Sequence, residues 1–158
     1  MRKLLSILSA TGLGLLVLSL GCSSSSERVL PDQDLELHAV TGTVRVDGEA
    51  AAGVSLGFQP ADGTKGSGGF ATTDAEGKFT VVSASGRDGL PAGTYHILLT
   101  WLTTKDGKPI PKDAMMADYD FVNQLPERFN THEGTPYFVG VEAGENPPLE
   151  LDVKRNAK

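Results

Sequence analysis

The chain has 158 residues, enough for one domain, and a formal net charge of −6. Its 19 glycines and 9 prolines are typical of a turn-rich β protein rather than a helical one. An acidic surface gains nothing from counterion release on a nucleic acid, so the charge argues against that class of partner. The single cysteine, Cys22, excludes a disulfide framework and a cysteine-based zinc site.

Residues 1–21 predict an export signal peptide. Arg2 and Lys3 precede a long apolar run, which ends in Gly21 and the thiol of Cys22. The stretch resembles a bacterial lipoprotein signal, which implies cleavage before Cys22 and attachment of fatty acyl chains, such as palmitate, to that residue. Ser23 replaces the Asp that resembles an inner-membrane retention mark. The expected location is therefore the bacterial cell envelope, at the outer membrane.

Two alternatives to the lipid anchor remain open. Cleavage after Gly21 without acylation would release a soluble protein with a free thiol. The uncharged run 4–21 would otherwise stay as a transmembrane helix, although it is short for that purpose and no basic stop follows it. Residues 22–34 are rich in serine and predict a flexible tether.

The part from residue 35 to 155 predicts one all-β domain. Apolar and polar residues alternate with a period of two, which indicates half-buried strands. Seven strands are expected, at residues 40–46, 54–59, 70–73, 78–81, 94–102, 137–141 and 149–153. Their number and the turns between them favour an antiparallel β-sandwich of transthyretin-like or immunoglobulin-like type.

Two local features qualify this pattern. Leu35, Leu37 and Ala39 have the opposite parity to the following strand, which predicts a bulge or break near Ala39. In the turn after residue 73, Asp74 is expected to accept backbone hydrogen bonds and Gly77 to adopt a positive φ.

Residues 103–135 interrupt the strand rhythm. The segment is too long for a hairpin loop, and Met115, Tyr119 and Val122 have helical spacing behind a capping Asp113. We expect an irregular excursion with a short helix that covers Leu98 and Leu102 of the central strand. Long insertions of this kind often carry function, although many are ordinary connections.

Three stretches resemble the carboxypeptidase regulatory-like domain, a transthyretin-like β-sandwich: 40–60, 72–81 and 90–101. The matching positions are Gly42, Gly48, Gly53, Thr73, Asp74, Gly77, Phe79, Gly93 and Tyr95. The chain departs from the pattern at Ala50-Ala51, where a proline is usual. Residues 125–130 and 135–153 also resemble the tail of small bacterial lipoproteins that carry this domain. The resemblance implies a non-catalytic domain at the cell envelope.

Signals for catalysis and cofactors are weak. The histidines (His38, His96 and His132) have no metal-ligand spacing and are expected to be solvated. The carboxylates of 113–120 match no calcium-loop pattern, and Met115-Met116 are expected to fill a core. The tail lacks the Tyr-Arg-Gly-Ser of hydroxyisourate hydrolases, and the chain lacks the Arg-x-His-x-His run of intradiol dioxygenases. We therefore predict no cofactor, no metal and no enzyme activity.

The function predicted from the sequence is that of a lipid-anchored envelope protein whose sandwich serves binding, scaffolding or assembly. Its partners would be the membrane, through the lipid, and an envelope protein or glycan. One alternative is a carbohydrate- or peptide-binding module, for which Trp101, Tyr119, Phe121 and Tyr137 are the candidate exposed aromatic residues. A second alternative is a hydrolase that uses His96 or His132 with nearby carboxylates.

Overall fold

The computed structural model describes residues 32–108, 110 and 120–155, and nearly all regular structure in them is β-strand. One sheet holds β1 (Thr41–Val46), β2 (Glu49–Ala50), β5 (Lys78–Thr80) and β11 (Leu149–Val153). A second holds, in spatial order, β10 (Phe138–Val141), β7 (Gly93–Thr100), β3 (Ser55–Pro60), β4 (Gly69–Thr72) and β6 (Val82–Ser83). A hairpin of β8 (Leu102–Thr104) and β9 (Phe121–Asn123) and a 3-10 helix η1 (Glu127–Asn130) complete this part.

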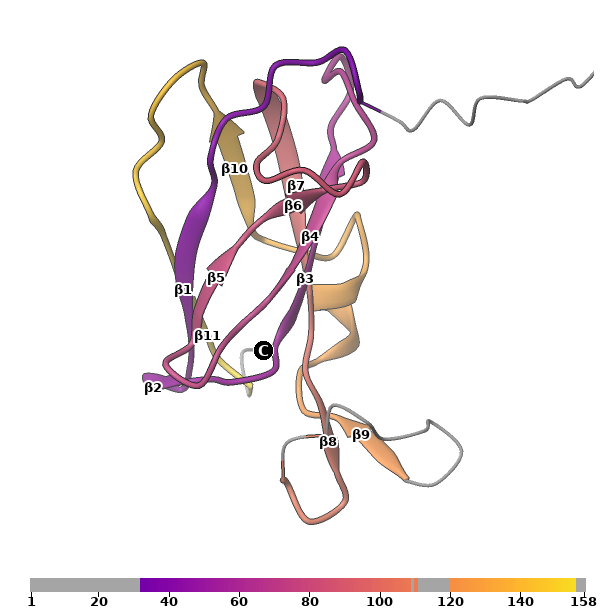
Figure 1. Cartoon of the computed structure of the whole chain (residues 1–158). Coiled ribbons are helices and arrows are strands. Elements are labelled where there is room, and N and C mark those ends of the chain that lie inside the picture. The colour runs from indigo at the N-terminus through magenta and orange to yellow at the C-terminus, as the bar shows by residue number, and fades with distance from the viewer. Residues whose placement is uncertain (1–31, 109, 111–119, 156–158) are drawn as a thin grey trace, which may run out of the picture.

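The predicted all-β, sandwich-like class is confirmed. Figure 1 shows the two larger sheets as facing layers, with the β8–β9 hairpin projecting from one end. Each of the seven expected strands is present, and alternate side chains point into the space between the layers. The largest fully buried side chains include Leu56, Phe58, Tyr95, Ile97 and Leu99. Burial of each such side chain contributes about 1.5–3 kcal/mol, so the facing layers form the main source of stability.

One pairing differs from the expected antiparallel arrangement. β1 and β11 run parallel, in a register from Gly42↔Leu149 to Val46↔Val153. Parallel neighbours need a long crossover connection, and here nearly the whole domain lies between the two strands. Alternation along each strand is the same for either direction, so the sequence pattern carried no information on this choice. The other strand pairs of both sheets are antiparallel.

The predicted break near Ala39 lies one residue earlier, between Leu37 and His38. Leu35 and Leu37 are half-buried with Glu36 exposed between them. His38 and Val40 are buried and Ala39 is exposed, so the inward side changes from odd to even positions at His38. His38 exchanges backbone hydrogen bonds with Leu90, at 2.8 and 3.0 Å. His38 is 7% exposed, so the prediction that it is solvated is wrong.

The turn at 74–77 has the expected geometry. Asp74 Oδ1 accepts hydrogen bonds from the backbone N–H groups of Glu76 and Lys78, at 3.0 and 2.8 Å. Gly77 has a φ of +75°, and a Cβ built on it would lie 2.7 Å from the carbonyl oxygen of Val44. Two constraints therefore favour glycine at position 77: the left-handed backbone conformation and the close approach of β1.

The two ends of the sandwich carry different parts of the chain. At one end, Asp32 accepts hydrogen bonds from the backbone N–H of Ser67, and Arg87 donates to carbonyls of Asp32, Gln33 and Leu35. These contacts reach three residues into the segment 22–34 that was predicted as a tether. The β8–β9 hairpin lies at the opposite end (Figure 1).

The described part of the 103–135 excursion is β-hairpin and 3-10 helix. Val122, which was expected in a helix, lies in β9, where it pairs with Thr103 of β8 and is 40% exposed. The expected helical positions 113, 115 and 119 lie outside the described residues. Phe129 of η1 is buried and joins the core beside β7, while Leu98 and Leu102 are half-buried. The excursion therefore packs onto the sandwich partly through η1.

Candidate functional site

The outer face of the five-stranded sheet carries no charged side chain in its described strands. Because Leu56, Ala71, Ile97 and Val139 point inward, their neighbours in each strand point outward. The outward residues are Ser55, Gly57, Gln59, Phe70, Thr72, Val82, Thr94, His96, Leu98, Thr100, Phe138 and Gly140. This composition contrasts with a chain in which 22% of residues are charged. Depletion of charge is a property of the buried centre of binding interfaces.

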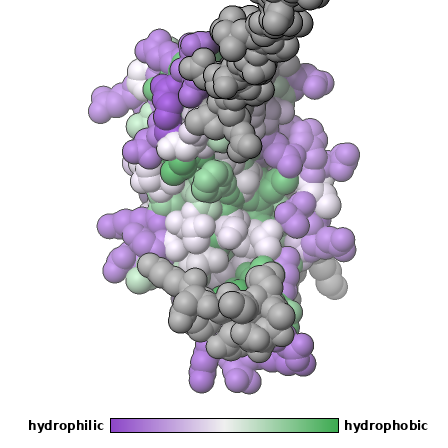
Figure 2. Space-filling model, turned by 45° about the vertical axis from the view of Figure 1, so that its right-hand side comes forward, coloured by the Kyte–Doolittle hydropathy of each residue, from purple (hydrophilic) through white to green (hydrophobic). Residues whose placement is uncertain are grey.

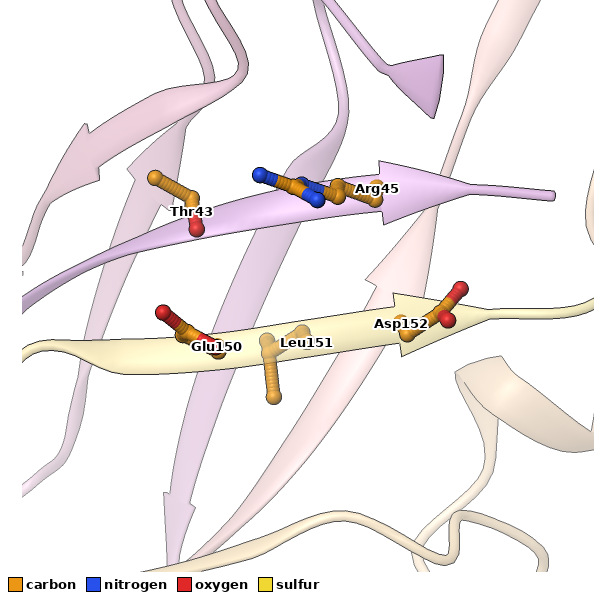
Figure 3. A pocket seen from close by; sticks show the side chains of 5 residues that line it. All are labelled: Thr43, Arg45, Glu150, Leu151 and Asp152. Carbon is orange, nitrogen blue, oxygen red and sulfur yellow. The ribbon is translucent and has the colours of Figure 1, made fainter. Parts of the chain in front are cut away.

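The outer face of the four-stranded sheet is an ordinary charged surface. A hollow of about 130 Å³ lies on it. Figure 3 shows Thr43 and Arg45 of β1, which line this hollow, beside Glu150 and Asp152 of β11. Its volume is below the roughly 300–1,000 Å³ of small-molecule pockets. Oppositely charged side chains at paired positions of two strands are typical of a sheet face in contact with water. The charge on this face can therefore be compared with its absence on the outer face of the five-stranded sheet.

Three aromatic side chains gather on the uncharged face, and we call them the histidine cluster: His96 of β7, His132 from the loop after η1, and Phe138 of β10. The His96 and His132 ring centroids are 3.8 Å apart with 34° between the planes, and His96 meets Phe138 at 4.8 Å in an edge contact. Phe138 is 58% exposed. His96 Nδ1 is shielded from solvent and has no hydrogen-bond partner among the described residues.

Phe70 stands apart from this cluster on β4. It is 57% exposed, and its register neighbours are Gly57 on β3 and Val82 on β6. A Cβ built on Gly57 would touch only Leu98, at 3.8 Å. The space above Gly57 is therefore open, and we call this gap in β3 beside Phe70 the low line. Gln59, the next outward residue of β3, is exposed and is the register partner of His96. Figure 2 shows hydrophobic side chains gathered at the centre of the face in view, with hydrophilic side chains around them.

A hollow of about 240 Å³ continues this low line towards the β8 end of the sheet. It is lined by Ser55 and Thr72 from the uncharged face, together with Gly53 and Leu102. The hollow offers hydroxyl groups and an apolar wall, and no charged side chain lines it. The face therefore combines two exposed phenyl rings, two imidazoles and a set of neutral hydrogen-bonding groups.

The aromatic residues expected from the sequence to be exposed have structural roles where they are described. Trp101 is half-buried and donates from Nε1 to the carbonyl of Ala52 at 3.0 Å. Tyr137 is half-buried and donates from its hydroxyl to the carbonyl of Asp152 at 2.7 Å. Phe121 is half-buried in β9, and residue 119 lies outside the described residues. The exposed phenyl rings at 70 and 138 were missed, although strand parity would have placed Phe138 outward.

The structure brings two of the three histidines together, which sequence spacing did not indicate. Neither imidazole of the His96–His132 pair makes a hydrogen bond to a Ser, Thr or carboxylate within residues 32–108 and 120–155, as a catalytic base would to a nucleophile and an orienting acid. No group of three or more His, Cys, Asp or Glu in the same residues is placed to hold a metal ion. Asp120 instead pairs with Lys105.

Comparisons with known proteins add little to this geometry. No family model matches the chain, and no curated protein matches it. Among solved structures, it is similar to a 9R-lipoxygenase from Cyanothece PCC8801, with 15% identity and a TM-score of 0.32. That alignment covers 75% of this chain and 16% of the lipoxygenase. In the described residues, no helix has both the length and the apolar character needed to cross a bilayer.

Proposed function

We propose that this protein is a lipid-anchored protein of the bacterial cell envelope whose non-catalytic β-sandwich binds a partner through the outer face of its five-stranded sheet. The observation that carries the proposal is the contrast between the two outer faces. One has charged residues at paired positions, and the other has two exposed phenyl rings and no charge in its described strands. Apolar surface that is kept free of charge in this way marks a site of interaction.

The arrangement of the chain suits attachment at the N-terminal side. The anchor at Cys22 lies outside the described residues, and its support is the signal sequence that precedes it. The first described residues of the chain lie at the end of the sandwich opposite β8–β9 (Figure 1). A bilayer near Asp32 would leave the hairpin pointing away from the membrane and the uncharged face open from the side. Ser23 supports the outer membrane as the location.

Membership of the carboxypeptidase regulatory-like family is part of the proposal. Its support is that the matching glycines have backbone roles that side chains would disturb. A Cβ on Gly42 would lie 2.4 Å from the carbonyl of Leu149, and Gly48, Gly53 and Gly77 have positive φ values. The domain boundaries, 1–21, 22–34 and 35–155, are proposed with it. Asp32 and Gln33, at the end of the second segment, contact the sandwich.

The anchor is tested by Cys22→Ala in the full-length chain. The wild-type protein should incorporate a labelled fatty acid and sediment with outer-membrane vesicles. The variant should lose the label and either move to the soluble fraction or keep its signal peptide, and Ser23→Ala should behave as the wild type. A wild-type protein without label that partitions as the variant does would refute the anchor.

The binding face is tested by a photo-reactive amino acid placed at Phe70, with the same residue at Thr43 on the charged face as the matched control. Irradiation of intact envelopes should give one defined covalent adduct from position 70 and none from position 43. Equal adducts from both positions, or none from either, would refute a binding role for the uncharged face.

A further inference from the structure

We propose that the uncharged face binds a neutral glycan, which lies along β3 between Phe70 on one side and the histidine cluster on the other. This inference rests on the proposed function and names the ligand class of the same surface. The low line over Gly57 and the hollow at Ser55 and Thr72 form one path over β3. A chain-like ligand follows such an open path, whereas a compact small molecule prefers an enclosed pocket.

Charge is the first argument for this ligand class. The chain carries a net charge of −6, yet the outward residues of β3, β4, β6, β7 and β10 include no Asp, Glu, Lys or Arg. An anionic lipid surface or an anionic polymer would be attracted by Lys and Arg side chains, and a cationic peptide by carboxylates. A face without either sign is complementary to a ligand without net charge.

The chemistry of the side chains is the second argument. A sugar ring has apolar C–H groups on its faces and hydroxyl groups around its edge. Phe70 and Phe138 offer exposed aromatic surface for the ring faces. Ser55 and Gln59 of β3 and Thr72 of the neighbouring β4 offer neutral donors and acceptors for the hydroxyl groups. His132 is exposed at the edge of the path and adds a further polar group.

The pairing of β3 argues against a peptide added as a strand. β3 is paired on both sides, with β7 and β4, so its backbone cannot accept a peptide as an added strand.

The test uses the full-length protein, purified in a neutral detergent, with maltoheptaose, cellohexaose, xylohexaose and chitohexaose as probes in titration calorimetry. Phe138→Ala removes one aromatic surface. Gly57→Thr fills the low line, and its new Cβ would meet only Leu98 at ordinary contact distance, so the variant should fold normally. Val122→Ala, an exposed apolar residue on β9, is the matched control.

We expect at least one neutral oligosaccharide to bind, with an association constant that falls about tenfold in Phe138→Ala and in Gly57→Thr, the equivalent of about 1.4 kcal/mol. Val122→Ala should leave the constant unchanged. Raising NaCl from about 0.05 to about 0.5 M should also leave it unchanged, because no charge takes part.

Absence of binding to all four probes would overturn the glycan assignment, and so would an equal loss in Val122→Ala. A concentration-dependent dimer in ultracentrifugation that Phe138→Ala dissociates would assign the face to a second copy instead. If position 70 forms its photo-adduct with a protein while no oligosaccharide binds, the proposed binding function stands and the glycan fails. If neither adduct nor oligosaccharide is found, both fail.

Discussion

Gly77 gives the most direct test of the backbone geometry, because the chain contains a matched control for it. Gly77 has a φ of +75° and Gly53 has a φ of +74°. A Cβ at Gly77 would lie 2.7 Å from the carbonyl oxygen of Val44, whereas a Cβ at Gly53 would have no atom within 4 Å. Replacement of each by alanine therefore carries the same cost for the left-handed backbone, and only one replacement forces strands apart.

The magnitude follows from these two contributions. An alanine in the left-handed region costs about 1–2 kcal/mol, which is the whole cost expected for Gly53→Ala. In Gly77→Ala the new methyl must also displace β1, and Val44 donates its N–H to the Gly77 carbonyl at 2.8 Å. Weakening of that hydrogen bond adds about 1 kcal/mol, and the close contact adds a similar amount. We expect about 3–4 kcal/mol for Gly77→Ala and more for Gly77→Val, because a β-branched residue fits the left-handed region least well.

The assay is urea unfolding of the full-length chain in neutral detergent, followed by the fluorescence of its single tryptophan, Trp101, which is half-buried. The gain from a stiffer unfolded chain is common to both alanine variants, so it cancels in their difference. Equal free energies of unfolding for Gly77→Ala and Gly53→Ala, at equal m-values, would show that β1 does not approach the turn as closely as described.

Three further predictions concern buried or paired polar groups. Desolvation, with the Asp32 charge second, raises the pKa of Tyr95 to about 12. The neutral phenol of Tyr95 therefore contributes to the free energy of unfolding in full below about pH 10, and this contribution of roughly 1–3 kcal/mol is lost as the pH rises towards 12. In Tyr95→Phe, the free energy of unfolding should not show this decrease between about pH 10 and 12. Thr73→Val should cost about 2–3 kcal/mol in urea unfolding, because its buried hydroxyl donates one backbone hydrogen bond and accepts another; a neutral result would contradict both bonds. The side-chain hydrogen bond from Arg155 lowers the pKa of Asp47 below 3.8. An NMR titration should show the Asp47 midpoint rise in Arg155→Gln, and an unchanged midpoint would rule out the ion pair in solution.

Parts of the binding surface were accessible from the sequence, and others were not. The alternation around Tyr95 places His96 and Leu98 on the outer face of a central strand, as expected. Nothing in the local pattern, however, indicated that His132, 36 positions further on, would stack on His96. That contact depends on how β10 and η1 return to β7, which is a property of the assembled sheet. The aromatic candidates were misjudged for the same reason, because the partners of Trp101 and Tyr137 come from distant loops and strands.

The sequence by itself determined the strands, the inward and outward side of most residues in them, and the glycine turn at 77. Each of these depends on neighbours a few positions away, through the two-residue period of a strand and the steric limits on φ. Only the tertiary structure decided that β1 pairs in parallel with β11, that His38 turns inward, and that one sheet face lacks charge while the other carries it. These features depend on which strands become neighbours, and strand pairing joins residues that are distant in the chain.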